Sequence, residues 1–261
     1  MMQTHQSDPR ILNRRTVERD HRGLVEHLRP GMQVLDAGCG TGSITAGIAR
    51  LIGPEGTATG VDRDASLLEI AQREHGAVPG LRFAQQDLLQ LPYVSQFDLV
   101  TAARVVQWIA EPPAALGGMR KAAKAGGVVV VLDYNHVENR WFPEPPEAFG
   151  RFYAAFLEWR AANGWRNRMA TELPELFREA GIEVLRIENS DEVAVRGEAG
   201  FAGAVGMWAE VAESLGPKIV EAGYLTEERR QEAVEAYRGW AAEGLERQAL
   251  CLRTVSGVAR S

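Results

Sequence analysis

Three glycines at alternate positions form the most informative motif of this sequence. Gly38, Gly40 and Gly42 follow a short apolar run that ends in Asp36, and the apolar residues after them have helical spacing. Glycine adopts backbone conformations that are closed to other residues, so a ligand can lie directly against the main chain. Open α/β sheets bind ligands at such loops, at the carboxyl ends of their strands. The motif therefore predicts a binding site for a nucleotide-like molecule.

The spacing of the glycines limits which nucleotide fits. A dinucleotide fingerprint reads G-x-G-x-x-G and places a pyrophosphate at the start of the helix. Gly38 and Gly40 fit that pattern, but Ser43 stands at the third glycine position, and Gly42 falls one position early. A P-loop is excluded because no Gly-Lys-Ser/Thr sequence follows. A nicotinamide or flavin enzyme is the less favoured alternative.

Strand and helix patterns alternate from Met32 to Leu132, at the rhythm of a parallel sheet with crossover helices. Strands are expected at 33–36, 57–61, 81–85, 97–101, 127–133, 182–187 and 249–255. Helices are expected at 41–51, between Asp64 as N-cap and Gly76, from Pro112 to near Gly126, and from Thr171 as cap to Gly181. The pattern predicts an α/β fold that positions the glycine loop at a sheet edge.

Two helical segments rich in aromatic residues interrupt this alternation. They span 145–163 and about 199–244, and we delimit the insertions at about 141–172 and 197–245 within a single domain of residues 1–261. Because they follow the fifth and sixth strands, they emerge at the ligand end of the sheet. We expect them, with residues 13–15, to close the site as a lid. The simpler interpretation is that they complete the core or form a dimer contact.

The composition is ordinary for a globular protein, with 45% hydrophobic and 25% charged residues. No apolar run approaches the roughly 20 residues of a membrane span, and residues 1–15 lack the apolar centre of a signal peptide. Two cysteines, Cys39 and Cys251, indicate a reducing compartment, so we expect a cytoplasmic protein. The net charge of −6 argues against a nucleic-acid partner, and the scattered histidines suggest no metal site.

The run from Asp36 to Gly42 resembles motif I of the class I S-adenosylmethionine (SAM) methyltransferases. The resemblance holds at each station from about residue 32 to 133, and the closing strands extend it to most of the chain. It implies a Rossmann-like, doubly wound sheet of seven strands in the order 3-2-1-4-5-7-6, with the last strand antiparallel. It also implies SAM as cofactor and S-adenosylhomocysteine (SAH) as product.

The resemblance assigns cofactor roles to the residues at these stations. Asp36 corresponds to the acid near the methionine moiety. Asp62 would accept both ribose hydroxyls, since a carboxylate offers two acceptors without reorientation. Asp87 begins the form D-x-x-x-L-P, in which the acid accepts from the adenine amino group. The simple alternatives are a surface-loop aspartate for Asp62 and a turn aspartate for Asp87, while Asp64 is more simply a helix cap.

The remaining stations complete the set of cofactor candidates. The backbone N–H that follows Asp87 would serve a ring nitrogen of adenine, and residues near Arg104 would lie beside the methionine moiety. The cofactor-binding candidates are Asp36, Gly38, Cys39, Gly40, Asp62, Arg63, Asp87, Leu88, Ala103 and Arg104.

Methyl transfer from a sulfonium is an in-line displacement, so the enzyme must chiefly align the reactants in a dry site. A general base helps only where the nucleophile is protonated at neutral pH. The catalytic candidates are Tyr134, which could orient the acceptor, and His136, which could titrate near neutrality. A hydrogen-bonding surface histidine is the simpler interpretation of His136. O-, N-, S- and C-methylation all stay open.

A small molecule is the expected methyl acceptor. Gln107-Trp108 is closer to family members that act on small carboxylic acids than to the histidine-containing versions of this stretch. No Asn-Pro-Pro-Tyr type of motif follows the fourth strand, which counts against adenine or glutamine methylation. The alternatives are a methyltransferase for protein or RNA, and a SAM-binding domain without catalysis. We expect no nucleic-acid or membrane partner and a monomer or homodimer.

Overall fold

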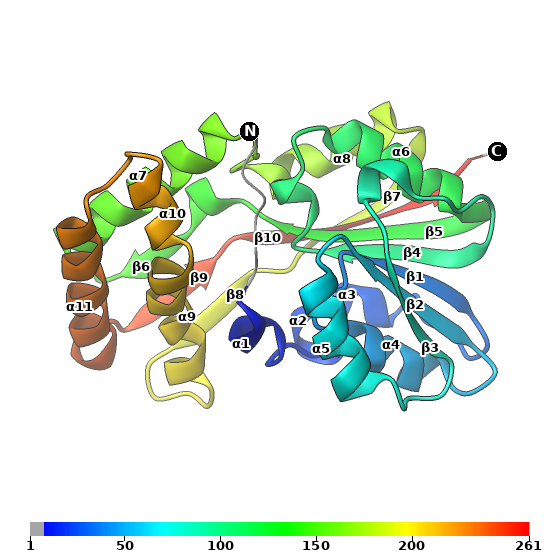
Figure 1. Cartoon of the computed structure of the whole chain (residues 1–261), viewed down its shortest axis with the longest axis horizontal. Helices are drawn as coiled ribbons and strands as arrows, with labels where there is room; N and C mark the ends of the chain where they lie inside the picture. Colours follow the sequence, from blue (N-terminus) through cyan, green and yellow to red (C-terminus); the bar gives the residue numbers. More distant parts are fainter. Residues whose placement is uncertain (1–7, 261) are drawn as a thin grey trace. The chain divides into compact units, whose positions relative to one another are not determined.

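The computed structural model describes residues 8–260. The chain divides into two compact units (Figure 1). The sheet unit comprises the described residues up to Tyr134, then 169–190, and those from Leu252 onward. The helical unit comprises 135–168 and 191–251. The chain therefore crosses from one unit to the other several times. The expectation of a single domain with two insertions stays a prediction.

The sheet unit contains a seven-stranded sheet in the order β3-β2-β1-β4-β5-β10-β7. The strands are β1 (Gln33–Ala37), β2 (Thr57–Asp62), β3 (Leu81–Gln85), β4 (Phe97–Ala103), β5 (Ala123–Tyr134), β7 (Ile182–Asn189) and β10 (Leu252–Ala259). Strand β10 is antiparallel to both of its neighbours, β5 and β7, while the pairs from β3 to β5 are parallel. The predicted strand order and the antiparallel last strand are confirmed.

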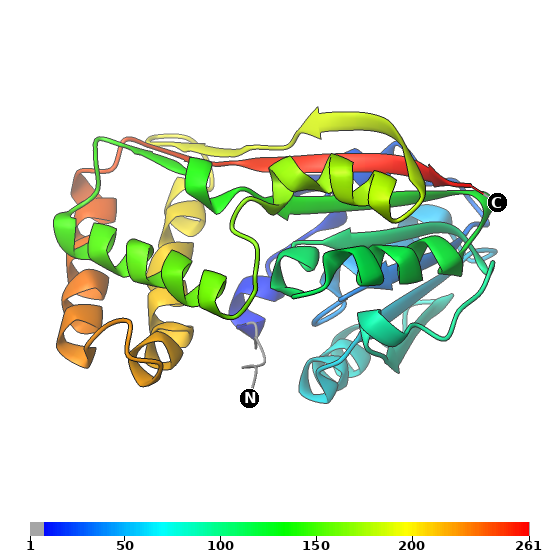
Figure 2. The ribbon, with the colours of Figure 1, turned by 90° about the horizontal axis from the view of Figure 1, so that it is seen from above.

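Helices cover both faces of this sheet (Figure 2). On one face lie α2 (Val17–Asp20), α3 (Arg22–Val25) and α4 (Ser43–Ile52), which pack on Val34, Leu99 and Val130. Helix α5 (Ala65–His75) lies against β2 and β3, and α1 (Pro9–Leu12) begins the described chain. On the other face lie α6 (Pro112–Ala122) and α8 (Met169–Glu179). Short 3-10 helices follow β3 at Leu88–Gln90 and β4 at Val106–Trp108.

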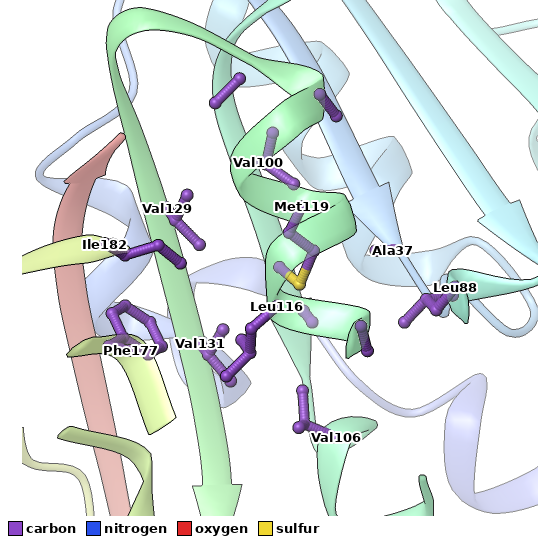
Figure 3. Packing of buried hydrophobic residues seen from close by; sticks show 14 of the residues in the cluster. Ala37, Leu88, Val100, Val106, Leu116, Met119, Val129, Val131, Phe177 and Ile182 are labelled. Atoms are coloured by element: carbon purple, nitrogen blue, oxygen red, sulfur yellow. The ribbon is translucent and has the colours of Figure 1, made fainter. Parts of the chain in front are cut away.

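The core beneath α6 explains why the sheet accepts a valine-rich central strand. Leu116 and Met119 of α6 are fully buried in one cluster with Val100 of β4 and Val131 of β5 (Figure 3). Phe177 of α8 belongs to the same cluster. Since β5 is covered on both faces, it needs apolar side chains in both directions.

Several predicted elements differ from the structure. The helix expected from Pro112 to near Gly126 ends at Ala122, and the strand expected at 127–133 begins already at Ala123. The helix expected to be capped by Thr171 begins at Met169, so Thr171 lies inside α8. The strand expected at 249–255 is two strands, β9 (Arg247–Leu250) and β10, which are separated at Cys251. The two halves pair with different sheets: β9 with β6 (Arg140–Phe142) and β8 (Glu192–Val195), β10 with β5 and β7. The apolar run 249–252 continues across the break at Cys251, so the sequence carries no sign of that change of partners.

The helical unit combines an antiparallel sheet, β6-β9-β8, with helices around an aromatic core. Its helices are α7 (Glu147–Ala162), α9 (Phe201–Ser214), α10 (Gly216–Glu221) and α11 (Glu227–Glu243). The predicted helical segments at 145–163 and 199–244 correspond to α7 and to the run from α9 to α11. Phe149, Phe156, Trp208 and Tyr237 are buried between them. Most of the aromatic residues are therefore packing residues.

Candidate functional site

A pocket lies within the sheet unit, at the carboxyl ends of β1, β2 and β4. It encloses about 970 Å³, a volume that includes space open to solvent. All the cofactor-binding candidates line it: Asp36, Gly38, Cys39, Gly40, Asp62, Arg63, Asp87, Leu88, Ala103 and Arg104. Residues that are far apart in sequence thus converge because parallel strands end at the same edge of the sheet.

The glycine loop is fixed by close contacts on both sides. Gly38, Gly40 and Gly42 have φ angles of 82°, 55° and 78°, in the left-handed region. A Cβ atom on Gly38 would lie 2.5 Å from Cγ2 of Val105, and one on Gly40 would lie 2.8 Å from Cδ1 of Leu12. Glycine is therefore required both by backbone angle and by space. Helix α4 starts directly after the loop, and its first residues, Ser43 and Ile44, line the pocket.

Asp36 is a buried carboxyl group at the end of β1. Its side chain is 3% exposed, and Oδ2 accepts a hydrogen bond from Oγ1 of Thr45 at 2.6 Å. Burial raises the pKa of Asp36 to about 6, the hydroxyl of Thr45 opposes this shift, and the charge of Asp62 adds to it. A cationic ligand group beside Asp36 would stabilise its ionised form. This position therefore suits an ammonium group.

Asp62 joins the ends of β1 and β2. Its Oδ2 accepts from the backbone N–H of Gly40 at 2.8 Å, and Oδ1 accepts from that of Asp64 at 3.0 Å. Burial raises the pKa of Asp62 despite these bonds. Each carboxylate oxygen can accept a further hydrogen bond, so the group can still receive two ligand hydroxyls. The surface-loop interpretation does not account for this placement.

Asp64 and Asp87 both cap the turns that follow them. Asp64 accepts from N and Oγ of Ser66 at 2.9 and 2.6 Å, which confirms it as the N-cap of α5. Asp87 accepts from the N–H of Leu89 at 2.9 Å and caps the 3-10 helix after β3. Asp87 is therefore a turn aspartate that also lines the pocket.

Arg104 begins the far wall of the pocket, after β4. Its φ angle is 61°, which is uncommon for a residue with a side chain. The side chain is 6% exposed. Its Nε donates to the hydroxyl of Tyr134 at 3.1 Å, and its Nη1 donates to the carbonyl of Asp20 at 2.7 Å. The guanidinium group thus ties the end of β4 to the end of β5 and to α2.

The order of the strands arranges these groups in a line. Asp87 follows β3, Asp62 ends β2, Asp36 lies on β1, and Arg104 follows β4, in the spatial order β3-β2-β1-β4. Neighbouring strands lie about 4.8 Å apart, so the line spans roughly 14 Å. A ligand that fits this line is extended, with a hydroxyl-rich middle and a cationic group near Asp36.

Thr41 gives independent evidence for a ligand. The residue lines the pocket, and its buried hydroxyl makes no hydrogen bond with any of the described residues. A buried polar atom without a partner costs free energy unless a ligand or water supplies the bond. Thr41 is therefore a further candidate for holding the polar end of the ligand.

Sequence reasoning missed part of the pocket wall. Leu12, Thr41, Val105, Trp108 and Ile109 line the pocket, although we did not assign them to the cofactor. The segment 13–15 was expected near the site, and Arg15 does line it. Thr41 could have been found from its place between two glycines. Leu12 offered no signal, because its proximity to Gly40 depends on tertiary packing.

The two catalytic candidates are not among the residues that line this pocket. Tyr134 ends β5 and accepts a hydrogen bond from Arg104. His136 belongs to the helical unit, is 5% exposed, and contacts the rings of Phe156 and Trp208 edge-on. Burial and the positive charge of Arg160 hold the pKa of His136 well below its usual range. The imidazole is therefore neutral at pH 7. A catalytic role for either residue, and closure of the pocket by the helical segments, stay predictions.

Comparison with known proteins shows the family to which this chain belongs. A family model described as a methyltransferase domain matches residues 28–181, more than half of the chain. The chain belongs to this family. The demethylmenaquinone methyltransferase of Staphylococcus aureus is 26% identical over 174 residues, which cover 62% of this chain and 72% of that protein.

Solved structures support the fold of this methyltransferase. The cyclase SpnF has a TM-score of 0.59 at 21% identity, with 98% of this chain and 86% of that chain covered. Phosphoethanolamine N-methyltransferase 2 of Haemonchus contortus, solved with phosphomonomethylethanolamine and SAH, has a TM-score of 0.57 at 16% identity, with 92% and 52% covered. At these identities the likeness concerns the fold.

The protein is thus a SAM-dependent methyltransferase of the class I fold. SAM fits the observed line of groups, since it is extended and carries an adenosine at one end and an ammonium group at the other. Among residues 8–260, no group of His, Cys, Asp and Glu side chains converges as a metal site, and no helix has the length and apolarity needed to cross a bilayer.

Proposed function

We propose that this methyltransferase binds SAM in the pocket of the sheet unit and methylates a small molecule. The observation that carries the proposal is the convergence of the cofactor candidates on one pocket, in the order in which SAM presents its parts. Adenine would lie near Asp87, the ribose at Asp62, and the methionine moiety between Asp36 and Arg104. When bound, SAM supplies an electrophilic methyl group on a sulfonium.

The residues of this chain would bind and orient SAM and exclude water from it. Asp62 would hold two hydroxyls while it keeps the glycine loop in place through the N–H of Gly40. Asp36 would become ionised as it pairs with the ligand ammonium group. The hydroxyl of Thr41 would donate to the carboxylate of the methionine moiety of SAM. Because a sulfide leaves without a proton, the main requirement is alignment in a dry site.

The part of the pocket beyond β4 suits a modest-sized, partly apolar acceptor. Val105, Trp108 and Ile109 follow β4 and line the pocket with apolar side chains, and Arg104 adds positive charge. Leu12 and Arg15 line the same pocket from the N-terminal segment. An apolar lining with a few polar or charged groups is typical of binding sites for small molecules. The names of two similar proteins point the same way, since one is a demethylmenaquinone methyltransferase and another was solved with phosphomonomethylethanolamine.

Two alternatives differ in what they predict. Methylation of protein or RNA would favour a basic groove at the pocket, whereas four aspartates, Asp36, Asp62, Asp64 and Asp87, line it beside the arginines. A SAM-binding protein with another activity is a real alternative, because a protein of similar fold is a cyclase by name. A cytoplasmic location is part of the proposal, supported by the low cysteine content of the sequence, which has only Cys39 and Cys251.

The experiment has two stages. Calorimetric titration should show binding of SAH and SAM and no binding of NAD, and binding of NAD alone would end the proposal. Incubation with SAM carrying a labelled methyl group and separate pools of small metabolites, protein and RNA should then label the small metabolites. Label in protein or RNA would establish the second alternative, and no transfer to any pool would favour a SAM-binding protein without methyl transfer.

A further inference from the structure

A buried network behind the pocket wall has no role in the function as described so far. Asp133 lies at the end of β5, is 0% exposed, and does not line the pocket. Its Oδ2 accepts from the N–H of Gln107 at 3.0 Å, and its Oδ1 accepts from the N–H of Tyr134 at 3.0 Å. A carboxylate in a valine-rich buried strand costs free energy unless it serves such bonds. It fixes the turn after β4 to the end of β5.

Gln107 carries the connection from Asp133 to Arg104. Its side chain is 1% exposed, and its Nε2 donates to the backbone carbonyl of Arg104 at 3.3 Å. The N–H of Arg104 donates to the carbonyl of Leu132 at 2.7 Å. Both polar groups of the Arg104 backbone are therefore held, one by β5 and the other by Gln107.

This support falls on a strained residue that lines the pocket. Arg104 has a left-handed backbone, which a residue with a side chain retains only when its surroundings hold it there. The same turn carries Val105, whose methyl groups fill the space that a side chain on Gly38 would need. The position of the turn thus sets both the wall beside β4 and the contact with the glycine loop.

We propose that Asp133 and Gln107 are positioning residues for the methionine end of the cofactor. They touch no ligand. They hold the Ala103–Val105 backbone in the one conformation that faces the amino-acid part of SAM, while the adenosine part depends on Asp62 and Asp87. The inference rests on SAM binding in this pocket, as proposed above.

The test compares two ligands and three variants. SAH contains the amino-acid part, whereas 5′-methylthioadenosine has the adenosine and sulfur without it. In Asp133→Asn, one of the two oxygens becomes an NH₂ group, so one backbone N–H loses its acceptor in either orientation of the amide. Gln107→Met keeps the length of the side chain and the backbone N–H bond to Asp133, and it removes the bond from Nε2 to the carbonyl of Arg104.

Asp98→Asn is the matched control. Asp98 also accepts from a backbone N–H, that of Gln33 at 2.8 Å, and it pairs with Lys124 at 2.6 Å. It lies near the start of β4, at the opposite end of the strand from the pocket. The control variant therefore loses a comparable acceptor without any connection to the turn after β4.

Calorimetry at a temperature at which each variant is folded gives the deciding result. We expect Asp133→Asn and Gln107→Met to weaken SAH binding by about fivefold or more, and to change 5′-methylthioadenosine binding by less than about twofold. Asp98→Asn should change neither. If Asp133→Asn does not fold, Gln107→Met decides alone.

Two results would overturn the inference. Unchanged SAH affinity in the folded variants would show that the network does not position the wall. Equal losses for both ligands would show a general disturbance of the pocket. If the wild-type protein binds neither ligand, it is the assignment of SAM to this pocket that fails, and the two failures are thereby distinguished.

Discussion

Replacing Asp62 by asparagine tests the assignment of the ribose directly. The two carboxylate oxygens already accept from the N–H groups of Gly40 and Asp64, and each has capacity for one ligand hydroxyl. Asparagine keeps the shape of the side chain but has only one acceptor oxygen. One of the two hydroxyls would then face an NH₂ group in place of an acceptor.

The expected loss follows from the kind of bond removed. A hydrogen bond to a charged group contributes about 1.5–3 kcal/mol, and a buried partner left unsatisfied costs a similar amount. The affinity for SAH should therefore fall by roughly 10- to 150-fold. The fold should survive, because Asp62 lies at the end of β2 and not in the core, although the loosened N–H of Gly40 will lower the melting temperature slightly.

Asp64→Asn is the matched control for this experiment. It removes the same charge two residues further on, and asparagine caps a helix as well as aspartate does. Since Asp64 caps α5 through Ser66, its variant should bind SAH within about twofold of the wild type. Calorimetry with SAH on both variants measures the difference. An equal loss in both would mean that charge alone matters, and no loss in Asp62→Asn would refute the assignment of Asp62 to the ribose.

Three further predictions concern stability. Gly38 and Gly31 share a φ angle of 82°, but of these two only Gly38 is crowded by a neighbouring side chain. Gly31→Ala should lower the free energy of unfolding by the roughly 1–2 kcal/mol of backbone strain, and Gly38→Ala should lower it further, as measured by denaturant unfolding. Equal losses would contradict the role of Val105. Burial raises the pKa of Asp36 from 3.8 to about 6, so the folded protein keeps a proton that the unfolded chain releases between these pH values. The contribution of Asp36 to stability should therefore fall by about 2 kcal/mol from pH 4 to 6, and Asp36→Asn should remove that slope; an unchanged slope would assign it to other groups. Tyr153→Phe removes a hydroxyl that donates to the carbonyl of His136 at 2.6 Å and accepts from Asn139 at 2.9 Å. The variant should be less stable by about 1–3 kcal/mol, as measured by the unfolding midpoint. A neutral effect would show that water replaces both bonds.

The central sheet could be predicted because its signals are local. Each parallel strand is a short apolar run between a turn and a helix, and residues of the turn type mark where the neighbouring helices begin and end. Gly53 and Asp64 end and begin helices as their residue types predict. The glycine loop could be predicted equally well, because alternate glycines after a strand that ends in an acidic residue are rarely needed except where a ligand lies against the backbone.

The small sheet of the helical unit could not be predicted because its strands are specified by distant partners. Strand β6 has only three residues, and it pairs with β9, which lies more than a hundred positions later. Three residues show no periodicity. The break at Cys251 is invisible for the same reason, since β9 and β10 are equally apolar and differ only in the sheet they join.

Two parts of the pocket wall differ in what builds them. One part uses strand-end acids and glycine backbone, whose positions follow once the strand order is known. The other part uses side chains such as Leu12 and Trp108, which come from separate segments and reach the same pocket only through the folding of the chain. A network such as Asp133–Gln107 is hidden for a further reason, because its residue types have no distinct spacing. The chemistry of the cofactor can therefore be inferred from sequence, while the choice of acceptor depends on contacts that only the folded chain reveals.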